Sequence, residues 1–282
     1  FIVQWQLDLS RVGCMTFWCI NDDPCGMCCV CLTYGLILFA DYVVCLELLL
    51  PWFGLTANSC MLGSSFLVIS LLALSSHLRT MLSDPGAVPE QYQPPTLLHE
   101  QSGVPMCSRC NAFKPPRAHH CSQCDRCIMK MDHHCPWVNN CVGANNQKHF
   151  VLFVGYTALL SLYALVLLGF RLVGGVSNDM TMAISVRNEP SVSVLYMCLL
   201  FFEAILFGLF TSAMLCEQLS SILADETGIE RLKHDYLAPK RSGIANMSET
   251  FGRPVSLLWL LPTAVRFHGL TWWDLMPMEH EV

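Results

Sequence analysis

The chain has 282 residues, of which 53% are hydrophobic and only 13% are charged, with a formal net charge of −6. This composition is too apolar for a soluble globular protein and predicts a membrane protein. The net charge by itself identifies no partner, because membrane proteins segregate their charges by side.

Four apolar stretches have spanning length, since about 20 helical residues cross the hydrocarbon core of a bilayer. They cover residues 25–50, 54–77, 150–170 and 192–216. Buried helices of a soluble protein are the alternative, but the stretches are long and separated by turns, which favours membrane spans. The first stretch starts well into the chain and carries Asp41 and Glu47, so we expect it to stay in the membrane rather than be cleaved as a signal peptide.

The basic residues indicate the topology, because Lys and Arg next to spans are retained on the cytosolic side. Fourteen of the 16 precede the first span, follow the fourth or lie between the second and third, whereas Arg171 and Arg187 follow the third. Both termini and the central loop 79–149 are therefore expected in the cytosol, with a turn at Pro51 and the loop 172–191 across the membrane. We predict four regions: residues 1–78 with the first two spans, a cytosolic cysteine-rich domain at 79–149, spans three and four within 150–218, and a cytosolic region at 219–282.

Seven of the 17 cysteines lie in a single stretch of 35 residues inside the central loop. A reducing compartment disfavours disulfides and favours metal binding or catalysis. Cys-x-x-Cys pairs and His-His doublets are typical of zinc sites, and two sites with three thiolates and one imidazole each would use six cysteines. One cysteine is left over. The pairs nominate Cys107, Cys110, Cys121 and Cys124, and spacing alone leaves open whether Cys127, Cys135 or Cys141 is the extra one.

Local context favours Cys135 as a nucleophile, because it directly follows Asp132, His133 and His134. An imidazole beside a thiol takes its proton or stabilises the thiolate, which is the reactive species. Asp132 could orient His133 as the third member of a triad does. The alternative that spacing leaves open is that Cys135 is an inert residue or an alternative zinc ligand. No internal repeat is evident in the chain.

The segments CSRCNAFKPPRAHHCSQCDRC and MDHHCPWVNNCVGANNQKHF, within residues 107–153, resemble the cysteine-rich domain of the DHHC protein acyltransferases, or palmitoyltransferases. The segments ALSSHLRTMLSDPGAVP and ADETGIERLK resemble the Golgi-type members. The resemblance implies an all-α membrane protein with four transmembrane helices and a cytosolic cysteine-rich domain that binds two zinc ions between helices two and three. It also implies a multi-pass protein of the Golgi membrane.

The resemblance assigns roles to the site residues. It implies that Cys135 is the nucleophile, His133 the base and Asp132 the residue that positions His133. It implies two structural Zn²⁺ ions, held by Cys107, Cys110, His120 and Cys127 and by Cys121, Cys124, His134 and Cys141. The implied reaction moves a long-chain acyl group, such as palmitoyl, from acyl-CoA to Cys135 and then to cysteines of membrane-associated substrate proteins. No nucleic acid is expected as a partner.

The sequence offers further candidates for substrate contacts. Residues that could shape an acyl slot are Ser59, Gly63, Phe150 and Phe153, with ordinary helix packing as the alternative. Bases that could contact CoA phosphates are Arg117, Lys130 and Lys148, with solvent or lipid headgroups as the alternative.

The chain departs from the family pattern at two positions. Gly228 stands where a second Thr is expected, and Leu261 stands where an Asn is expected before a Pro. A zinc-stabilised membrane scaffold without transferase activity is therefore a second hypothesis. A membrane-anchored RING-like or nucleic-acid-binding zinc module is a third, and it would leave the odd cysteine unexplained.

Overall fold

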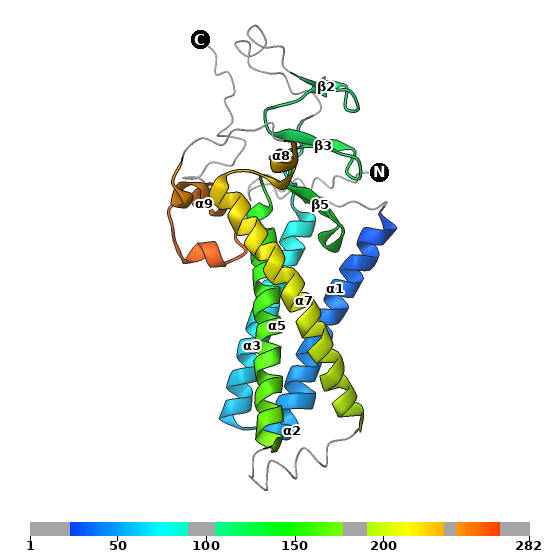
Figure 1. Ribbon diagram of the computed structural model, residues 1–282, viewed down its shortest axis with the longest axis vertical. Helices are drawn as coiled ribbons and strands as arrows, with labels where there is room; N and C mark the ends of the chain where they lie inside the picture. The colour runs from blue at the N-terminus through cyan, green and yellow to red at the C-terminus, as the bar shows by residue number, and fades with distance from the viewer. Residues whose placement is uncertain (1–22, 90–104, 177–190, 234–240, 266–282) are drawn as a thin grey trace, which may run out of the picture. The chain divides into compact units, whose positions relative to one another are not determined.

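The computed structural model describes residues 23–89, 105–176, 191–233 and 241–265 (Figure 1). The chain divides into two compact units, each built from segments far apart in sequence. We call them the cysteine-rich unit (Phe1–Val30, Ser76–Leu152 and Glu217–Val282) and the helical unit (Cys31–Ser75 and Phe153–Cys216). The cysteine-rich unit thus includes the region that follows the fourth predicted span.

Four long helices dominate the described chain. They are α1 (Pro24–Tyr42), continued by η1 (Val43–Leu49) and α2 (Leu50–Phe53), then α3 (Ala57–Leu82), α5 (Gln147–Val176) and α7 (Ser191–Ala224). All four are long and apolar enough to cross a membrane. The prediction of four spans is confirmed, and α7 runs eight residues beyond its predicted end at residue 216.

The turn after the first span lies three residues later than predicted. Pro51 lies in α2, near the end of the continuous helical segment Pro24–Phe53, and does not form the turn. The chain instead reverses at Gly54, whose φ of 62° is a backbone conformation that glycine adopts without strain.

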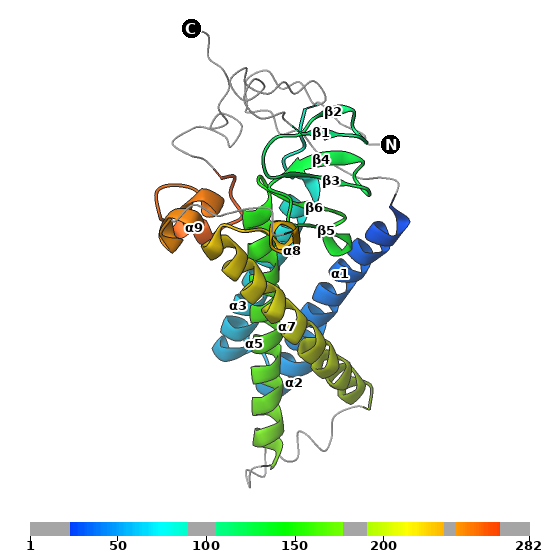
Figure 2. The same cartoon turned by 45° about the horizontal axis from the view of Figure 1, so that its top comes forward.

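The helical unit is held by packing along its helices. In both views α3 lies beside α5 (Figures 1 and 2). The hydroxyl groups of Ser65 and Tyr163 are 2.8 Å apart. Phe39 of α1 and Tyr196 of α7 form an edge-to-face ring pair. Buried side chains between the helices include Val43, Leu48, Phe66, Leu160, Leu167 and Leu200.

Carboxylates within the spans contact hydroxyl groups of other helices. Asp41 of α1 accepts a hydrogen bond from Ser70 of α3 at 2.7 Å, and Glu47 accepts one from Ser193 of α7 at 2.6 Å. An ionisable group in a membrane needs such partners. These two residues therefore join helices to one another.

Three antiparallel β-hairpins follow one another in the cysteine-rich unit (Figure 2). They pair β1 (Met106–Cys107) with β2 (Ala112–Phe113), β3 (Ala118–Cys121) with β4 (Arg126–Met129), and β5 (His133–Cys135) with β6 (Asn140–Val142). The short 3-10 turn η2 (Pro136–Val138) closes the third hairpin, and α8 (Gly228–Lys233), α9 (Gly243–Phe251) and η3 (Leu257–Leu260) follow α7. The predicted fold class, a mainly helical membrane protein with two candidate metal clusters between spans two and three, is confirmed.

Asparagine side chains anchor the third hairpin to the end of α3. The last carbonyl groups of a helix lack partners within the helix. The Asn140 amide lies 3.0 Å from the Thr80 carbonyl and 2.9 Å from the Ser83 carbonyl, and Asn146 donates to the carbonyl groups of Thr80 and Cys141. Since Asn140 pairs with Cys135 across the hairpin, these contacts also hold the strand that carries Cys135.

Candidate functional site

The three hairpins form an internal repeat of 14 residues. The first strands end at Cys107, Cys121 and Cys135, whose cross-strand partners are Ala112, Arg126 and Asn140. Each turn contains one residue with a left-handed backbone, namely Asn111, Asp125 and Asn139. Asn and Asp tolerate this conformation better than other non-glycine residues. Sequence analysis missed the repeat, although the two Cys-x-x-Cys pairs and the two His-His doublets are each 14 residues apart.

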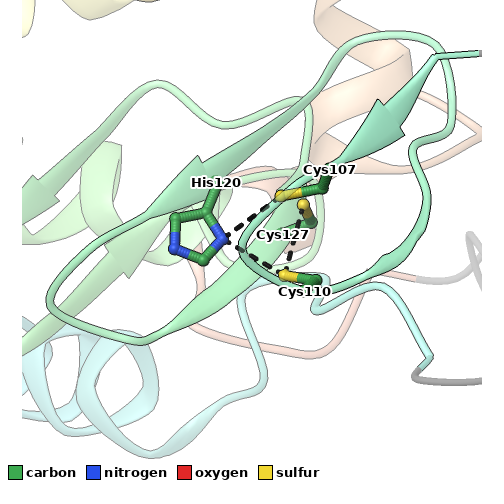
Figure 3. Close-up of side chains that lie close together, drawn as sticks. All are labelled: Cys107, Cys110, His120 and Cys127. Carbon is green, nitrogen blue, oxygen red and sulfur yellow. Dashed lines mark hydrogen bonds between the residues drawn. The ribbon is translucent and has the colours of Figure 1, made fainter.

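The repeat brings two sets of Cys and His side chains together in the same way. One hairpin contributes a Cys-x-x-Cys pair from its turn, and the next hairpin contributes a cross-strand His and Cys. The first set combines Cys107 and Cys110 with His120 and Cys127 (Figure 3), and the second combines Cys121 and Cys124 with His134 and Cys141. Within each set the four ligand atoms lie within 4.8 Å of one another.

The distances suit a tetrahedral cation of the size of zinc. Zn–S bonds of about 2.3 Å place two sulfur ligands about 3.8 Å apart. The sulfur atoms of Cys110 and Cys127 are 3.7 Å apart, and those of Cys124 and Cys141 are 3.4 Å apart. The Nδ1 atom of His120 lies 3.1 Å from the Cys110 sulfur. Each cluster could therefore hold one metal ion.

The surroundings of the two histidines also fit metal ligation. A ligating imidazole usually directs its second nitrogen to a carboxylate or another acceptor. The Nε2 atom of His120 lies 3.7 Å from an Asp125 oxygen, and that of His134 lies 4.0 Å from an Asp23 oxygen, so each ring has a carboxylate nearby but beyond hydrogen-bond distance. All the cysteines in the described residues are free, so the thiols of both sets are available as ligands.

The third hairpin lacks the second cysteine of its turn. Cys135 occupies the position of Cys107 and Cys121 in the repeat, but Val138, which is fully buried, replaces the second cysteine. The two clusters take up Cys127 and Cys141 and leave Cys135 outside both. Its thiol is therefore not a ligand in either candidate metal site of the described chain.

Strand geometry gives the two adjacent histidines different environments. Side chains alternate between the two faces of a strand, so His133 and Cys135 share one face of β5 and His134 points to the other. His134 pairs with Cys141 across the hairpin and joins the second cluster. His133 faces the thiol of Cys135.

Asp132 holds His133 in place. One oxygen of the buried Asp132 carboxylate accepts a hydrogen bond from His133 Nδ1 at 2.7 Å. Burial alone would raise the pKa of Asp132, but hydrogen bonds from His133, the Gly228 amide and Gln218 keep that pKa below its ordinary value. Asp132 is therefore ionised and able to stabilise a protonated imidazole.

The contacts of His133 favour its protonated form. Burial alone would lower the pKa of His133, but Asp132 and the Cys135 thiol together raise that pKa to about 9. Its ring packs edge-on against Phe150, with centroids 5.2 Å apart. The Nε2 atom is buried and makes no other hydrogen bond within the described residues. It is the ring nitrogen available to the thiol.

Known proteins match this chain over most of its length. A family profile described as DHHC palmitoyltransferase matches residues 100–235. Palmitoyltransferase ZDHHC3 of Rattus norvegicus is 46% identical over 260 residues, which cover 90% of this chain and 86% of that protein. Palmitoyltransferase ZDHHC7 of the same species is 44% identical over 264 residues, or 90% of this chain and 83% of that protein.

The chain belongs to the DHHC palmitoyltransferase family. This confirms the predicted resemblance and the predicted enzyme class, protein S-acyltransferase, at the level of the family.

The first departure from the DHHC pattern, Gly228, leaves a backbone contact in place. The Gly228 amide donates to the second Asp132 oxygen at 2.9 Å. A Cβ atom at this position would lie 3.5 Å from that oxygen, an ordinary contact distance. Thr227 and Glu230 cap α8 reciprocally, since each side chain accepts from the other's backbone amide. The remaining residues of this element thus form a complete helix cap beside Asp132.

The second departure, Leu261, lies in a segment that another residue holds. The buried Lys148 ammonium donates to the Leu258 carbonyl at 2.9 Å and to the carbonyl and hydroxyl oxygens of Thr263. The Trp259 indole donates to the Gly252 carbonyl at 2.8 Å. These bonds fix the C-terminal segment of this DHHC protein around Leu261.

The three bases suggested for CoA phosphates have protein partners instead. Arg117 contacts Glu230 at 2.7 Å and Asp225 at 2.9 Å, and Lys130 contacts Asp225 at 2.9 Å. Lys148 holds the C-terminal segment. A phosphate group would have to compete with these contacts, so the three bases serve to join the hairpins and α5 to the region after α7.

The residues suggested for an acyl slot fall into different environments. Phe150 contacts the His133 ring. Ser59 lies in the first turn of α3, where its hydroxyl donates to the Gly54 carbonyl at 2.6 Å, and is a turn residue. A side chain at Gly63 would contact Cys45 and Leu49 of η1, so this glycine lies at a contact between helices.

Proposed function

We propose that this protein is a protein S-palmitoyltransferase that moves a long-chain acyl group from acyl-CoA to Cys135 and then to cysteines of substrate proteins at the cytosolic membrane face. One observation supports this most strongly. Cys135 lies outside both metal clusters and on the same strand face as His133, which Asp132 holds at 2.7 Å.

The first stage acylates the enzyme. His133 Nε2 takes the thiol proton, and the Cys135 thiolate attacks the carbonyl carbon of the acyl-CoA thioester. The bond from that carbon to the CoA sulfur breaks, and CoA leaves with the proton that His133 held. Asp132 stabilises the imidazolium that forms during this exchange.

The second stage is the same chemistry with another thiol. A substrate cysteine gives its proton to His133, attacks the acyl-Cys135 carbonyl and releases the Cys135 thiolate. One thioester replaces another at each stage, so the exchange is nearly isoenergetic. The residues of the protein therefore supply proton transfer and positioning rather than a large driving force.

Structural zinc is the metal proposed for both clusters. Four protein ligands fill the coordination sphere of Zn²⁺, and a filled sphere stabilises a fold without activating a water. The proposed ligands are those of the two sets described above, Cys107, Cys110, His120 and Cys127 and Cys121, Cys124, His134 and Cys141. When bound, zinc supplies cross-links that hold the short hairpins, and thereby β5, in a defined shape.

The membrane context agrees with an acyl substrate. Each CH₂ group removed from water contributes about 0.8 kcal/mol, so a long acyl chain favours an apolar environment. Phe150, which touches His133, would lie near the reacting end of the chain. We further propose that residues 79–149 and both termini face the cytosol, that the protein resides in the Golgi membrane, and that its substrates are membrane-associated proteins with cytosolic cysteines.

The test is formation of a thioester adduct. Purified protein in detergent is incubated with labelled palmitoyl-CoA, and we expect a hydroxylamine-sensitive label on Cys135. Cys135→Ser should abolish it, whereas Cys198→Ser, which removes an exposed cysteine of α7, should not. Absence of label on the unmodified protein, where a ZDHHC3 protein labels, would favour the scaffold hypothesis and reject the transferase.

A further inference from the structure

A glutamine outside every motif of the chain contacts the proposed catalytic residues. Gln218, near the end of α7, is 1% exposed. Its Nε2 atom donates to the Asp132 carboxylate at 2.7 Å, and its Oε1 atom accepts from the Gln147 amide, 3.3 Å away in the first turn of α5. Gln218 is 86 residues from Asp132 in sequence, so no local pattern indicates the contact.

We propose that Gln218 is a positioning residue for acyl transfer, whose amide group, oriented by Gln147, fixes the Asp132 carboxylate and through it the His133 ring. The proposal rests on the proposed function, because it assigns a part to Gln218 in the same reaction.

Gln218 acts on the same carboxylate oxygen that His133 uses. Asp132 Oδ2 accepts from both His133 Nδ1 and Gln218 Nε2, each at 2.7 Å, while Oδ1 accepts from the Gly228 amide at 2.9 Å. Three donors from three segments thus determine the plane of the carboxylate. A carboxylate with a fixed plane holds the imidazole in one orientation and one tautomer, which leaves Nε2 for the thiol.

The direction of the Gln218 amide matters, because its two ends have similar shapes but opposite hydrogen-bonding character. In the observed orientation the NH₂ group faces Asp132 and the carbonyl faces the Gln147 donor. A flipped amide would bring its carbonyl oxygen against the Asp132 carboxylate and its NH₂ against the Gln147 NH₂. The Asp132 carboxylate, which can only accept, and the Gln147 amide, which donates to the Gln218 carbonyl, together favour the orientation that supports Asp132.

The first test removes the amide without changing the size of the side chain. Gln218→Met is expected to lower the self-acylation rate about tenfold, the size of one hydrogen bond to a charged group. Metal content and unfolding temperature serve to check the fold. The matched control is Asn246→Leu, which removes another buried amide that donates to the Leu223 carbonyl, away from Asp132. Its rate should stay within about twofold of the unmodified protein.

The second test examines amide direction. Gln147→Met removes the donor that orients Gln218, so a moderate loss of rate is expected. Gln147→Glu places an acceptor there and favours the flipped Gln218 amide, so it should lower the rate more than Gln147→Met does. A merely structural role predicts rates that follow the unfolding temperatures of the two variants, and that outcome would overturn the proposal.

The third test asks whether Gln218 acts through Asp132. The rate at which iodoacetamide alkylates Cys135, followed on its peptide by mass spectrometry, is measured for Gln218→Met with and without Asp132→Asn. We expect a loss of about tenfold when Asp132 is intact and of less than about twofold in the Asp132→Asn background. Equal losses in both backgrounds, or no loss in either, would overturn the proposal. Because alkylation needs no acyl-CoA, this readout remains if the unmodified protein forms no acyl adduct, and failure of the proposed function is then seen separately.

Discussion

At the residue scale, the site depends on which face of a strand each side chain occupies. The four residues Asp132 to Cys135 are adjacent in sequence. Their order indicated that Cys135 is a nucleophile, that a neighbouring histidine is its base and that Asp132 orients this base. Alternation along β5 then separates His133 from His134, which joins Cys141 and the second cluster. The Gln218 contact could not be predicted, because it depends on how the end of α7 meets the third hairpin.

The separation of the two histidines predicts different losses when each is removed. His133→Ala should keep both metal ions and the unfolding temperature but lower self-acylation by about 10²-fold or more, the usual size of a general-base contribution. His134→Ala should reduce the metal content toward one ion per chain and also lower the unfolding temperature, because one cluster loses a ligand. Metal analysis together with adduct labelling checks this. Equal metal loss in both variants would contradict the division of roles.

At the element scale, the hairpins are repeated units whose differences carry function. Two turns have a second cysteine and the third has Val138, so the same backbone makes two candidate metal sites and then presents one unpaired thiol. The spacing of the Cys-x-x-Cys pairs was sufficient to predict two clusters. The sequence does not reveal the partners of the basic residues, because Arg117 is 108 residues from Asp225 and 113 from Glu230.

The ion pairs of Arg117 should stabilise the cysteine-rich unit. Asp225 and Glu230 are almost fully buried, and Arg117→Ala leaves Glu230 without its cationic partner and Asp225 with Lys130 alone. The substitution should lower the free energy of unfolding by about 3 kcal/mol. The control is Arg241→Ala, which breaks an exposed pair with Glu249 and should cost less than about 1 kcal/mol. Denaturant unfolding in detergent measures both.

The same pairs predict a pH dependence. Burial alone would raise the pKa values of Asp225 and Glu230, but Lys130 and Arg117 hold the Asp225 pKa below its ordinary value, and Arg117 does the same for Glu230. Carboxyl groups with lowered pKa values stabilise the fold above their ordinary pKa range, and this contribution is lost as the pH falls through the native values. Unfolding curves should therefore show lower stability at acidic pH. Arg117→Ala should show a smaller pH dependence, and an unchanged one would contradict the assignment.

At the scale of the whole molecule, composition predicted most of the architecture. Four spans follow from the length and apolarity of four segments, and the helices agree with them except at their ends. Those ends could not be located from hydropathy, because polar residues such as Gln147 and Gln218 continue α5 and α7 beyond the apolar stretches and make contacts in the cysteine-rich unit. Hydropathy measures preference for lipid, whereas these residues remain helical because they have partners.

The distribution of basic residues makes trypsin a direct probe of topology. Arg109 in the central loop is exposed, and Arg187 lies in the loop between spans three and four, outside the described residues. The excess of Lys and Arg in the central loop places Arg109 in the cytosol and the loop that carries Arg187 on the other side. In sealed vesicles with the cytosolic face outward, trypsin should therefore cut at Arg109 and spare Arg187. After detergent opens the vesicles, cleavage at Arg187 should appear, which shows that the site is a trypsin substrate once exposed. Peptide mass spectrometry distinguishes the two cuts.

Cleavage at Arg187 in sealed vesicles would place that loop in the cytosol and reverse the proposed orientation. Cys135 would then face the compartment opposite to the acyl-CoA pool.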